Sequence, residues 1–230
     1  MDTTTILQQA GSLATDEEKL MLLAGFIGDH FEDLEPRDFI RLLTPLVDIT
    51  KRRYEQDANL DTMSDYSTAL TKLAEYYTKE EQSWLATPLL AKAEALLREQ
   101  PDLEENAEWK YNTYCQIGEC YYSNQRRLKA KDAYQQALHY ATSAGLDTED
   151  CDYCLQRIEN PTLKYDPVED TDGYLAVIDE VERRLYDELK NEPRGMGFCF
   201  QYWSAKRDLL AEYGIEWRSP NIMNPRVLFD

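Results

Sequence analysis

Hydrophobic residues recur at intervals of three and four along most of this chain, with polar residues between them. This spacing places the hydrophobic side chains on one face of a helix and the polar side chains on the other. One such stripe, in the C-terminal part of the chain, consists of Tyr174, Ile178, Val181, Leu185 and Leu189. The pattern predicts no β-strand, and it indicates an all-α protein of nine or ten helices.

Residues 15 to 145 divide into three pairs of consecutive helices. The first pair opens at Thr15, where Glu18 gives the spacing of a capping box, and Pro36 begins its second helix. The positions that match between the three pairs are Leu20, Leu70 and Tyr114, separated by 50 and 44 residues. These separations predict long helices or long connecting loops.

The ends of the second and third pairs are marked by residues that start and stop helices. Thr87 as an N-cap and Pro88 at the first helical position predict a helix that ends near Glu99. The third pair begins near Leu103, and Gly145 is placed to stop its second helix.

The third pair also carries a characteristic order of large and small residues. Its first helix contains Tyr114, Ile117, Gly118 and Tyr121, and its second contains Ala130, Tyr134 and Ala137. Two helices that cross closely need small residues at the crossing and large ones around it. This order resembles a tetratricopeptide repeat, a helix-turn-helix unit of about 34 residues. The resemblance is clear over about 65–145, loose over 15–60 and absent after residue 160.

The resemblance implies a short right-handed α-solenoid, in which stacked helix pairs bury their apolar faces and leave a concave groove. In that family the groove holds peptides or partner helices. The family's groove positions fall on Thr68, Thr71, Lys72, Glu75, Asn112, Cys115, Gln116, Glu119 and Tyr122. One branch of the family clamps a terminal carboxylate with Lys and Asn where this chain has Cys115 and Glu119. We therefore expect no such ligand here.

The chain divides into three regions by composition. Residues 1–158 form the repeat-like region, and 159–173 form an acidic, proline-containing linker or crossing. Residues 174–230 supply a C-terminal helical cap followed by an extended tail. The tail is too rich in Pro and Asn for a helix, yet it is strongly apolar, so we expect it to cap the solenoid. Two alternatives are that Trp217 and Phe229 anchor it in the groove or in another copy of the chain.

The charge of the chain limits its partners. A formal net charge of -19 over 230 residues disfavours nucleic acid, whose phosphates such a surface repels. No signal peptide and no apolar run long enough for a membrane helix is visible. The five Cys form no disulfide-like framework, which favours the reducing cytoplasm. These features predict a cytoplasmic protein that binds neither nucleic acid nor membrane.

Residues suited to catalysis or metal binding are scarce. His30 and His139 are the two histidines, and Cys151 and Cys154 form a single Cys-x-x-Cys without a second ligand pair. No glycine-rich phosphate loop follows a strand. The sequence predicts no catalytic residue, no metal site and no cofactor.

Two hypotheses about function follow. The first is a non-catalytic adaptor or scaffold that binds a protein or peptide in the groove, with a homo-oligomer as a further possibility. The alternative is an enzyme or small-molecule-binding regulator whose site lies between the solenoid and the C-terminal helices. Its candidate residues are Arg194, Trp203, Lys206, Trp217 and Arg218. An open groove would favour the first hypothesis and a closed pocket the second.

Overall fold

The structure is a computed structural model that describes residues 2–101 and 104–229, and these residues contain helices and no strand. The all-α prediction is therefore confirmed for this part of the chain. The α-helices are α1 (Thr3–Ser12), α2 (Asp16–Asp29), α3 (Pro36–Gln56), α4 (Leu60–Lys79), α5 (Ser83–Glu99), α6 (Glu104–Ser123), α7 (Arg127–Ala144), α8 (Glu149–Glu159), α9 (Asp172–Leu189), α10 (Phe198–Glu212) and α11 (Pro220–Met223). A short 3-10 helix, η1 (Pro167–Asp170), precedes α9. Among the helices described, none combines the length and the apolar composition that a membrane crossing requires.

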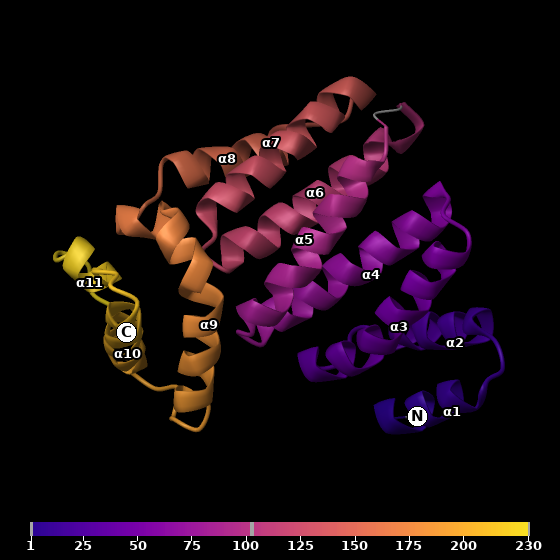
Figure 1. The fold of residues 1–230 in the computed structure, drawn as a ribbon, viewed down its shortest axis with the longest axis horizontal. Helices are drawn as coiled ribbons and strands as arrows, with labels where there is room; N and C mark the ends of the chain where they lie inside the picture. The colour runs from indigo at the N-terminus through magenta and orange to yellow at the C-terminus, as the bar shows by residue number, and fades with distance from the viewer. Residues whose placement is uncertain (1, 102–103, 230) are drawn as a thin grey trace.

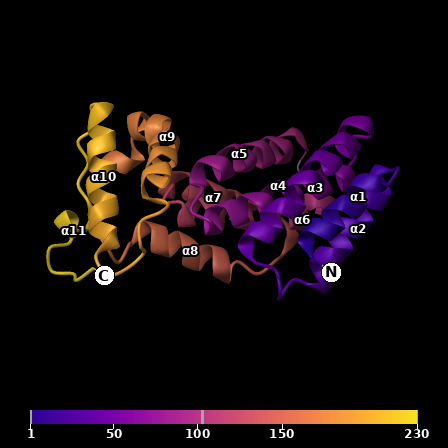
Figure 2. The same ribbon diagram turned by 90° about the horizontal axis from the view of Figure 1, so that it is seen from below.

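The helices form an elongated body with the two ends of the chain at opposite ends (Figure 1). Consecutive helices pack against each other from α2 to α8, and α4 also packs against α6. Helix α9 leaves this row and packs against α5, with α10 beside it (Figure 2). The C-terminal helices therefore lie across one side of the row of helix pairs.

The turns of two helix pairs share one geometry. Glu81 and Gln125 each adopt a left-handed backbone with φ of 58°, although neither is a glycine. In each turn the next amide donates to a carbonyl five residues back, Gln82 to Tyr77 and Arg126 to Tyr121, at 2.8 Å in both cases. This bond satisfies a carbonyl that a helix end leaves without a partner. Since the two turns are 44 residues apart, as Leu70 and Tyr114 are, the chain is repeat-like in this region.

The number of helices was underestimated at both ends of the chain. Helix α1 was not predicted; the Asp2 side chain caps it by accepting from the Thr5 amide at 2.8 Å. Helix α11 is a single turn in a tail that was expected to be extended, and Pro220 starts it rather than excluding it. Proline suits a first helical turn because the amide it lacks would have no partner there.

The predicted start of α5 was wrong. The helix begins at Ser83, so Pro88 lies inside it instead of at its first position. The hydroxyl of Thr87 donates to the Ser83 carbonyl at 3.0 Å, so Thr87 bonds within the helix rather than capping it. The predicted start of the third pair at Leu103 lies outside the described residues, and α6 is described from Glu104.

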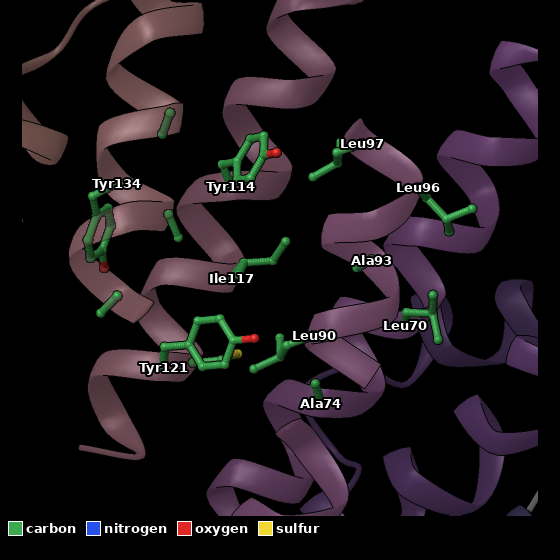
Figure 3. Packing of buried hydrophobic residues seen from close by; sticks show 14 of the residues in the cluster. Leu70, Ala74, Leu90, Ala93, Leu96, Leu97, Tyr114, Ile117, Tyr121 and Tyr134 are labelled. Atoms are coloured by element: carbon green, nitrogen blue, oxygen red, sulfur yellow. The ribbon is translucent and has the colours of Figure 1, made fainter. Parts of the chain in front are cut away.

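Three hydrophobic clusters hold the fold together. The first lies among α1 to α4 and the largest among α4 to α8. In the largest cluster, Tyr121 of α6 points toward Leu90 of α5 (Figure 3), and both are almost completely buried. The third cluster joins α9, α10 and the tail through residues that include Trp217. The Trp217 side chain therefore packs against the C-terminal helices and not in the expected groove, where an alternative hypothesis placed it.

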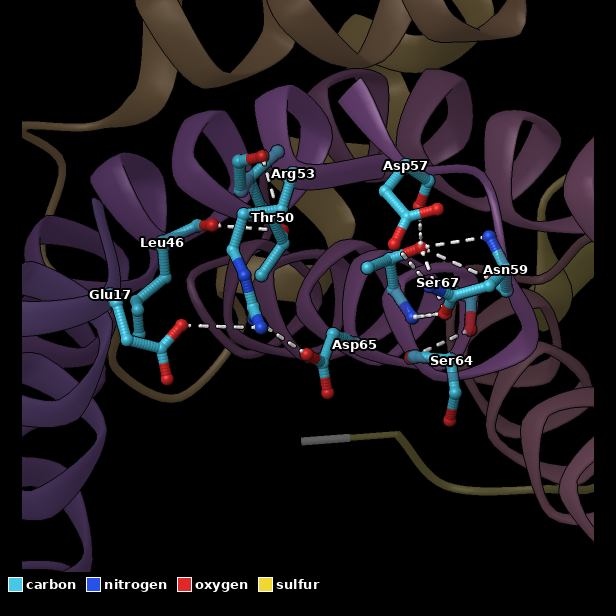
Figure 4. Close-up of polar contacts among 11 residues, drawn as sticks. Glu17, Leu46, Thr50, Arg53, Asp57, Asn59, Ser64, Asp65 and Ser67 are labelled. Carbon is cyan, nitrogen blue, oxygen red and sulfur yellow. Dashed lines mark hydrogen bonds and ion pairs between the residues drawn. The ribbon is translucent and has the colours of Figure 1, made fainter. Parts of the chain in front are cut away.

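Polar side chains also connect the first helices of the chain. Arg53 of α3 donates to Asp65 of α4 at 2.8 Å and lies 3.3 Å from Glu17 of α2 (Figure 4). Asn59 and Thr62 form a capping box at the start of α4. The ion pairs of Arg53 are partly exposed, so they contribute little to stability, whereas the capping box satisfies amides at the start of α4.

Gly118 lies where α6 and α7 cross, and the crossing leaves no room for a side chain. A Cβ atom at this position would lie 3.0 Å from three atoms of the Tyr134 ring. We expect Gly118→Ala to lower the free energy of unfolding by about 1–2 kcal/mol, because overpacking outweighs the gain in helix propensity. Urea denaturation measures the change.

The matched control is Gly25→Ala in α2, where an added Cβ would meet nothing within 4 Å. That variant should gain about 0.5–1 kcal/mol from helix propensity alone. Equal effects of the two substitutions would contradict the close crossing of α6 and α7.

Candidate functional site

The expected groove residues of α4 form contacts with one another and with α6. Lys72 and Glu75 form an ion pair with 3.0 Å between nitrogen and oxygen. Thr71 is buried, and its hydroxyl donates to the Gln116 side chain of α6 at 3.0 Å. Thr68 is exposed. Thr71 and Gln116 therefore join the two helices, while Thr68 remains open to a partner.

On α6 the expected groove residues differ in exposure. Asn112 is exposed, but Cys115 is half-buried with its sulfur 3.3 Å from that of Cys151 on α8. Burial raises the pKa of both thiols, so they are neutral at pH 7 and poor nucleophiles. Cys151 thus faces Cys115, and the Cys-x-x-Cys spacing with Cys154 has no role in this contact.

Glu119 and Tyr122 lie at the C-terminal end of α6 and line a cavity of about 480 Å³. Glu119 accepts a hydrogen bond from the Tyr134 hydroxyl at 3.1 Å. Tyr122 is half-buried, with the Arg157 guanidinium of α8 5.0 Å from the centre of its ring. These two are the expected groove residues that reach a cavity.

We call this hollow the groove-end cavity. Five segments form it: the end of α6, the start of α7, the end of α8, the segment before α9 and the start of α11. Its lining consists of Glu119, Tyr122, Ser123, Gln125, Arg127, Arg157, Pro161, Leu163, Lys164, Tyr165, Glu169 and Pro220. Three cations and two carboxylates thus face it in a chain with a formal net charge of -19.

A second hollow of about 370 Å³, the inter-unit cavity, lies between the turns of the helix pairs and the helices α9 and α10. Arg194 and Trp203 line it, as the alternative hypothesis expected. Arg194 pairs with Glu81 at 2.6 Å and lies over the Phe198 ring. Ser83 also lines this cavity, and its hydroxyl is buried without a hydrogen-bond partner in the part of the chain that is described.

The other three residues of the alternative hypothesis lie elsewhere. Lys206 is buried and pairs with Glu182 at 2.8 Å. The indole nitrogen of Trp217 donates to Glu169 at 2.8 Å, and Arg218 pairs with Asp166 at 3.1 Å. The Trp217 and Arg218 contacts hold the tail against the segment before α9, and the Lys206 contact joins α10 to α9. Lys206, Trp217 and Arg218 are not among the residues that line the inter-unit cavity, although Glu182 is.

Most of the residues that line the one cavity or the other were not predicted from the sequence. Arg157 and Lys164 were not singled out, because each is a separate charge in an ordinary polar context. Ser83 and Glu182 belong to helices whose relative position no local pattern specifies. Arg127 belongs to a basic run at the start of α7, but that run gives no sign of what it faces.

Metal binding finds no support in the described residues, where no three His, Cys, Asp or Glu side chains gather in a way that could hold an ion. No protein-family profile, curated protein or solved structure matches the chain significantly. The two cavities and the surface of the helix pairs are the features of the chain that indicate a function.

The Lys206–Glu182 pair is the most deeply buried ion pair near either cavity. The side chains are 3% and 15% exposed, and Tyr202 also donates to Glu182. Burial raises the pKa of the Glu182 carboxyl, but Lys206 and Tyr202 more than offset this and hold the pKa below its ordinary value of 4.5. Such a lowered pKa stabilises the fold above about pH 4.5, and this contribution is lost as pH falls through the folded-state pKa.

We expect Lys206→Met to cost about 3–5 kcal/mol at pH 7, because it leaves Glu182 charged and buried without its cation. In this variant the Tyr202 hydrogen bond remains but the cation is lost, so burial, the largest influence on this group, raises the pKa of Glu182. Protonation then relieves the cost as pH falls. The difference from the wild type should therefore shrink between pH 7 and pH 4.5. Urea denaturation at both pH values measures it.

Lys190→Met is the control, since Lys190 forms an exposed pair with Asp187 at 3.0 Å. It should change the stability by less than about 0.5 kcal/mol at either pH. A cost of Lys206→Met that is the same at pH 7 and pH 4.5 would contradict the assigned charge state of Glu182.

Proposed function

We propose that this protein is a non-catalytic interaction module of the cytoplasm, which binds a peptide or helix of another protein. In this proposal α2 to α7 are tetratricopeptide-like helix pairs of a short right-handed solenoid. The packing of consecutive helices, the α4–α6 contact and the two matching turns support it. The five cysteines, which are all free thiols, support the cytoplasmic location.

The observation that carries the proposal is the position of the groove-end cavity. It is lined by Glu119 and Tyr122, two residues at the family's groove positions. Asn112 lies two helical turns before Glu119 on the same helix and is exposed, as is Thr68 on α4. Amide, hydroxyl and carboxylate side chains can hydrogen-bond a peptide backbone, and a tyrosine ring can pack on a side chain. The surface of α4 and α6 thus offers exposed polar side chains that lead to the groove-end cavity.

A partner can be sought without knowing its identity. Peptides selected from a random display library against the wild-type protein should lose at least about tenfold in affinity for Tyr122→Ala or Asn112→Ala. The controls Tyr213→Ala and Gln135→Ala change exposed residues of α10's C-cap and of α7. Fluorescence anisotropy measures each dissociation constant.

The controls should bind the selected peptides within about twofold of the wild type. Peptides that bind the two groove variants as well as the wild type would contradict the proposal, as would a library that yields no binder. Light scattering of the free protein shows whether a second copy of the chain already occupies the surface.

A second candidate function is small-molecule binding in the inter-unit cavity. The buried, unpaired hydroxyl of Ser83 favours it, because buried polar groups in proteins normally have a partner. The cavity walls include the rings of Tyr186, Tyr202 and Trp203. A flat ligand that packs on these rings fits this lining, and it can hydrogen-bond Ser83 once a small side-chain movement opens the hydroxyl to the cavity.

A thermal-shift screen of small metabolites tests the second candidate. A true ligand should raise the melting temperature of the wild type and of Ser204→Ala, an exposed serine of α10. Ser83→Ala should reduce the affinity by about fivefold or more, since one neutral hydrogen bond is lost. Ligands that stabilise wild type and Ser83→Ala equally, or no ligand at all, would exclude this role of Ser83.

A further inference from the structure

Cations without an acidic partner are uncommon in this chain, which has 44 acidic residues and 25 lysines and arginines. Among the described residues, those that form no ion pair are Lys92, Lys129, Arg157, Lys164 and Arg226. Arg157 and Lys164 line the same groove-end cavity. Two cations that the fold leaves without a carboxylate therefore meet at one hollow, although acids outnumber bases elsewhere.

Arg157 is held by aromatic rings and not by hydrogen bonds. Its guanidinium lies 5.0 Å from the centre of the Tyr122 ring and 5.7 Å from that of Tyr153. A guanidinium on an aromatic face keeps the N–H donors in its own plane available. Within the described part of the chain, no acceptor receives a hydrogen bond from this side chain. Arg157 is thus positioned, charged and free to bind an anion.

Lys164 is positioned through its backbone. Its amide donates to the Asn224 side chain at 2.8 Å, and its carbonyl accepts from the same side chain at 2.7 Å. Asn224 is itself almost completely buried in the tail. The tail therefore fixes where the Lys164 side chain begins, which reduces the entropy lost when its ammonium group binds a ligand.

Arg127 supplies a third cation. One of its terminal nitrogens donates to Glu169 at 2.6 Å, and its guanidinium lies 3.2 Å from the centre of the Tyr165 ring. The Nε atom of the same side chain is buried and has no acceptor among the described residues. Because this atom is closed off from solvent, a ligand oxygen reaches it only if the side chain moves. Arg127 therefore contributes chiefly its positive charge, from a side chain that is 16% exposed.

We propose that the groove-end cavity binds the phosphoryl group of a phosphorylated peptide side chain. Arg127, Arg157 and Lys164 come from three separate segments around the hollow and suit a group with three terminal oxygens. Glu169 is already bonded to Arg127 and Trp217, and Glu119 to Tyr134. The net charge of -19 does not prevent binding, because charges beyond about 8 Å are screened at physiological ionic strength.

A peptide is the favoured source of the phosphoryl group because the cavity shares Glu119 and Tyr122 with the expected groove. This inference rests on the proposed function, since the rest of the peptide has to lie along α6 and α4. A carboxylate side chain has two oxygens and would leave one of the three cations unused. We therefore expect a phosphorylated residue to bind more tightly than an acidic one.

The first experiment uses phenyl phosphate as the probe and follows the Nε–H signals of arginine by NMR. Titration should shift the signals of Arg127 and Arg157 in the wild type. The double variant Arg157→Gln/Lys164→Gln should weaken the affinity at least about tenfold, because two charged donors are lost. Lys92→Gln removes an unpaired cation of α5 that is not part of this lining and should change the affinity less than about twofold.

The second experiment compares two peptide libraries that are identical except for a fixed phosphoserine or serine. Phosphoserine peptides should bind the wild type and Lys92→Gln at least about tenfold more tightly than their serine counterparts. Arg157→Gln/Lys164→Gln should lose this preference while it still binds the serine peptides. Urea denaturation of each variant verifies that the fold is intact.

The outcomes separate this inference from the proposed function. Serine and phosphoserine peptides that bind equally, and depend on Tyr122, would overturn the inference and leave the groove proposal standing. Phenyl phosphate that binds while no peptide does would show a site for a free anion and overturn both. Signals of Arg127 and Arg157 that do not move in the titration would also overturn the inference.

Discussion

The contact of Gly118 with the ring of Tyr134 determines how closely α6 and α7 approach. The Tyr134 ring packs against Gly118, and its hydroxyl donates to Glu119, which lines the groove-end cavity. One side chain therefore links the crossing of two helices to the wall of the candidate site. Along the same helix, Tyr121 is buried in the core and Tyr122 borders the cavity. A shift of α7 relative to α6 would change the core and the cavity together.

The segment between α8 and α9 is held in place by two buried carboxylates, a type of group that proteins seldom bury. Glu169 accepts from both Trp217 and Arg127, and Asp166 pairs with Arg218. Burial raises the pKa of Asp166, but hydrogen bonds from the side chain and backbone of Arg218 offset this and lower it below its ordinary value. Buried charges of this kind need every partner in place, so they specify one path for the segment and the tail.

Hydrophobic periodicity predicted the helices from α2 to α10 and the buried face of α6, because each of these depends on residues that are close in sequence. The start of α5 was predicted wrongly, because Pro88 was interpreted as the first residue of a helix although the helix passes through it. The contacts of Thr71 with Gln116 and of Cys115 with Cys151, on neighbouring helices, were not predicted either. Those contacts depend on how neighbouring helices are positioned against each other, and a local sequence pattern does not specify this position.

The two cavities depend on the same turn. Ser123 and Gln125, between α6 and α7, line both of them, and Gln125 has the left-handed backbone of the repeated turn geometry. A non-glycine residue in that conformation is strained, and it persists because the Arg126 amide bonds the Tyr121 carbonyl at 2.8 Å. The hydrogen bonds that end one helix and begin the next thus shape the walls of both candidate sites. For this reason the cavities follow from the geometry of the helix pair, although the charges that line them come from distant parts of the chain.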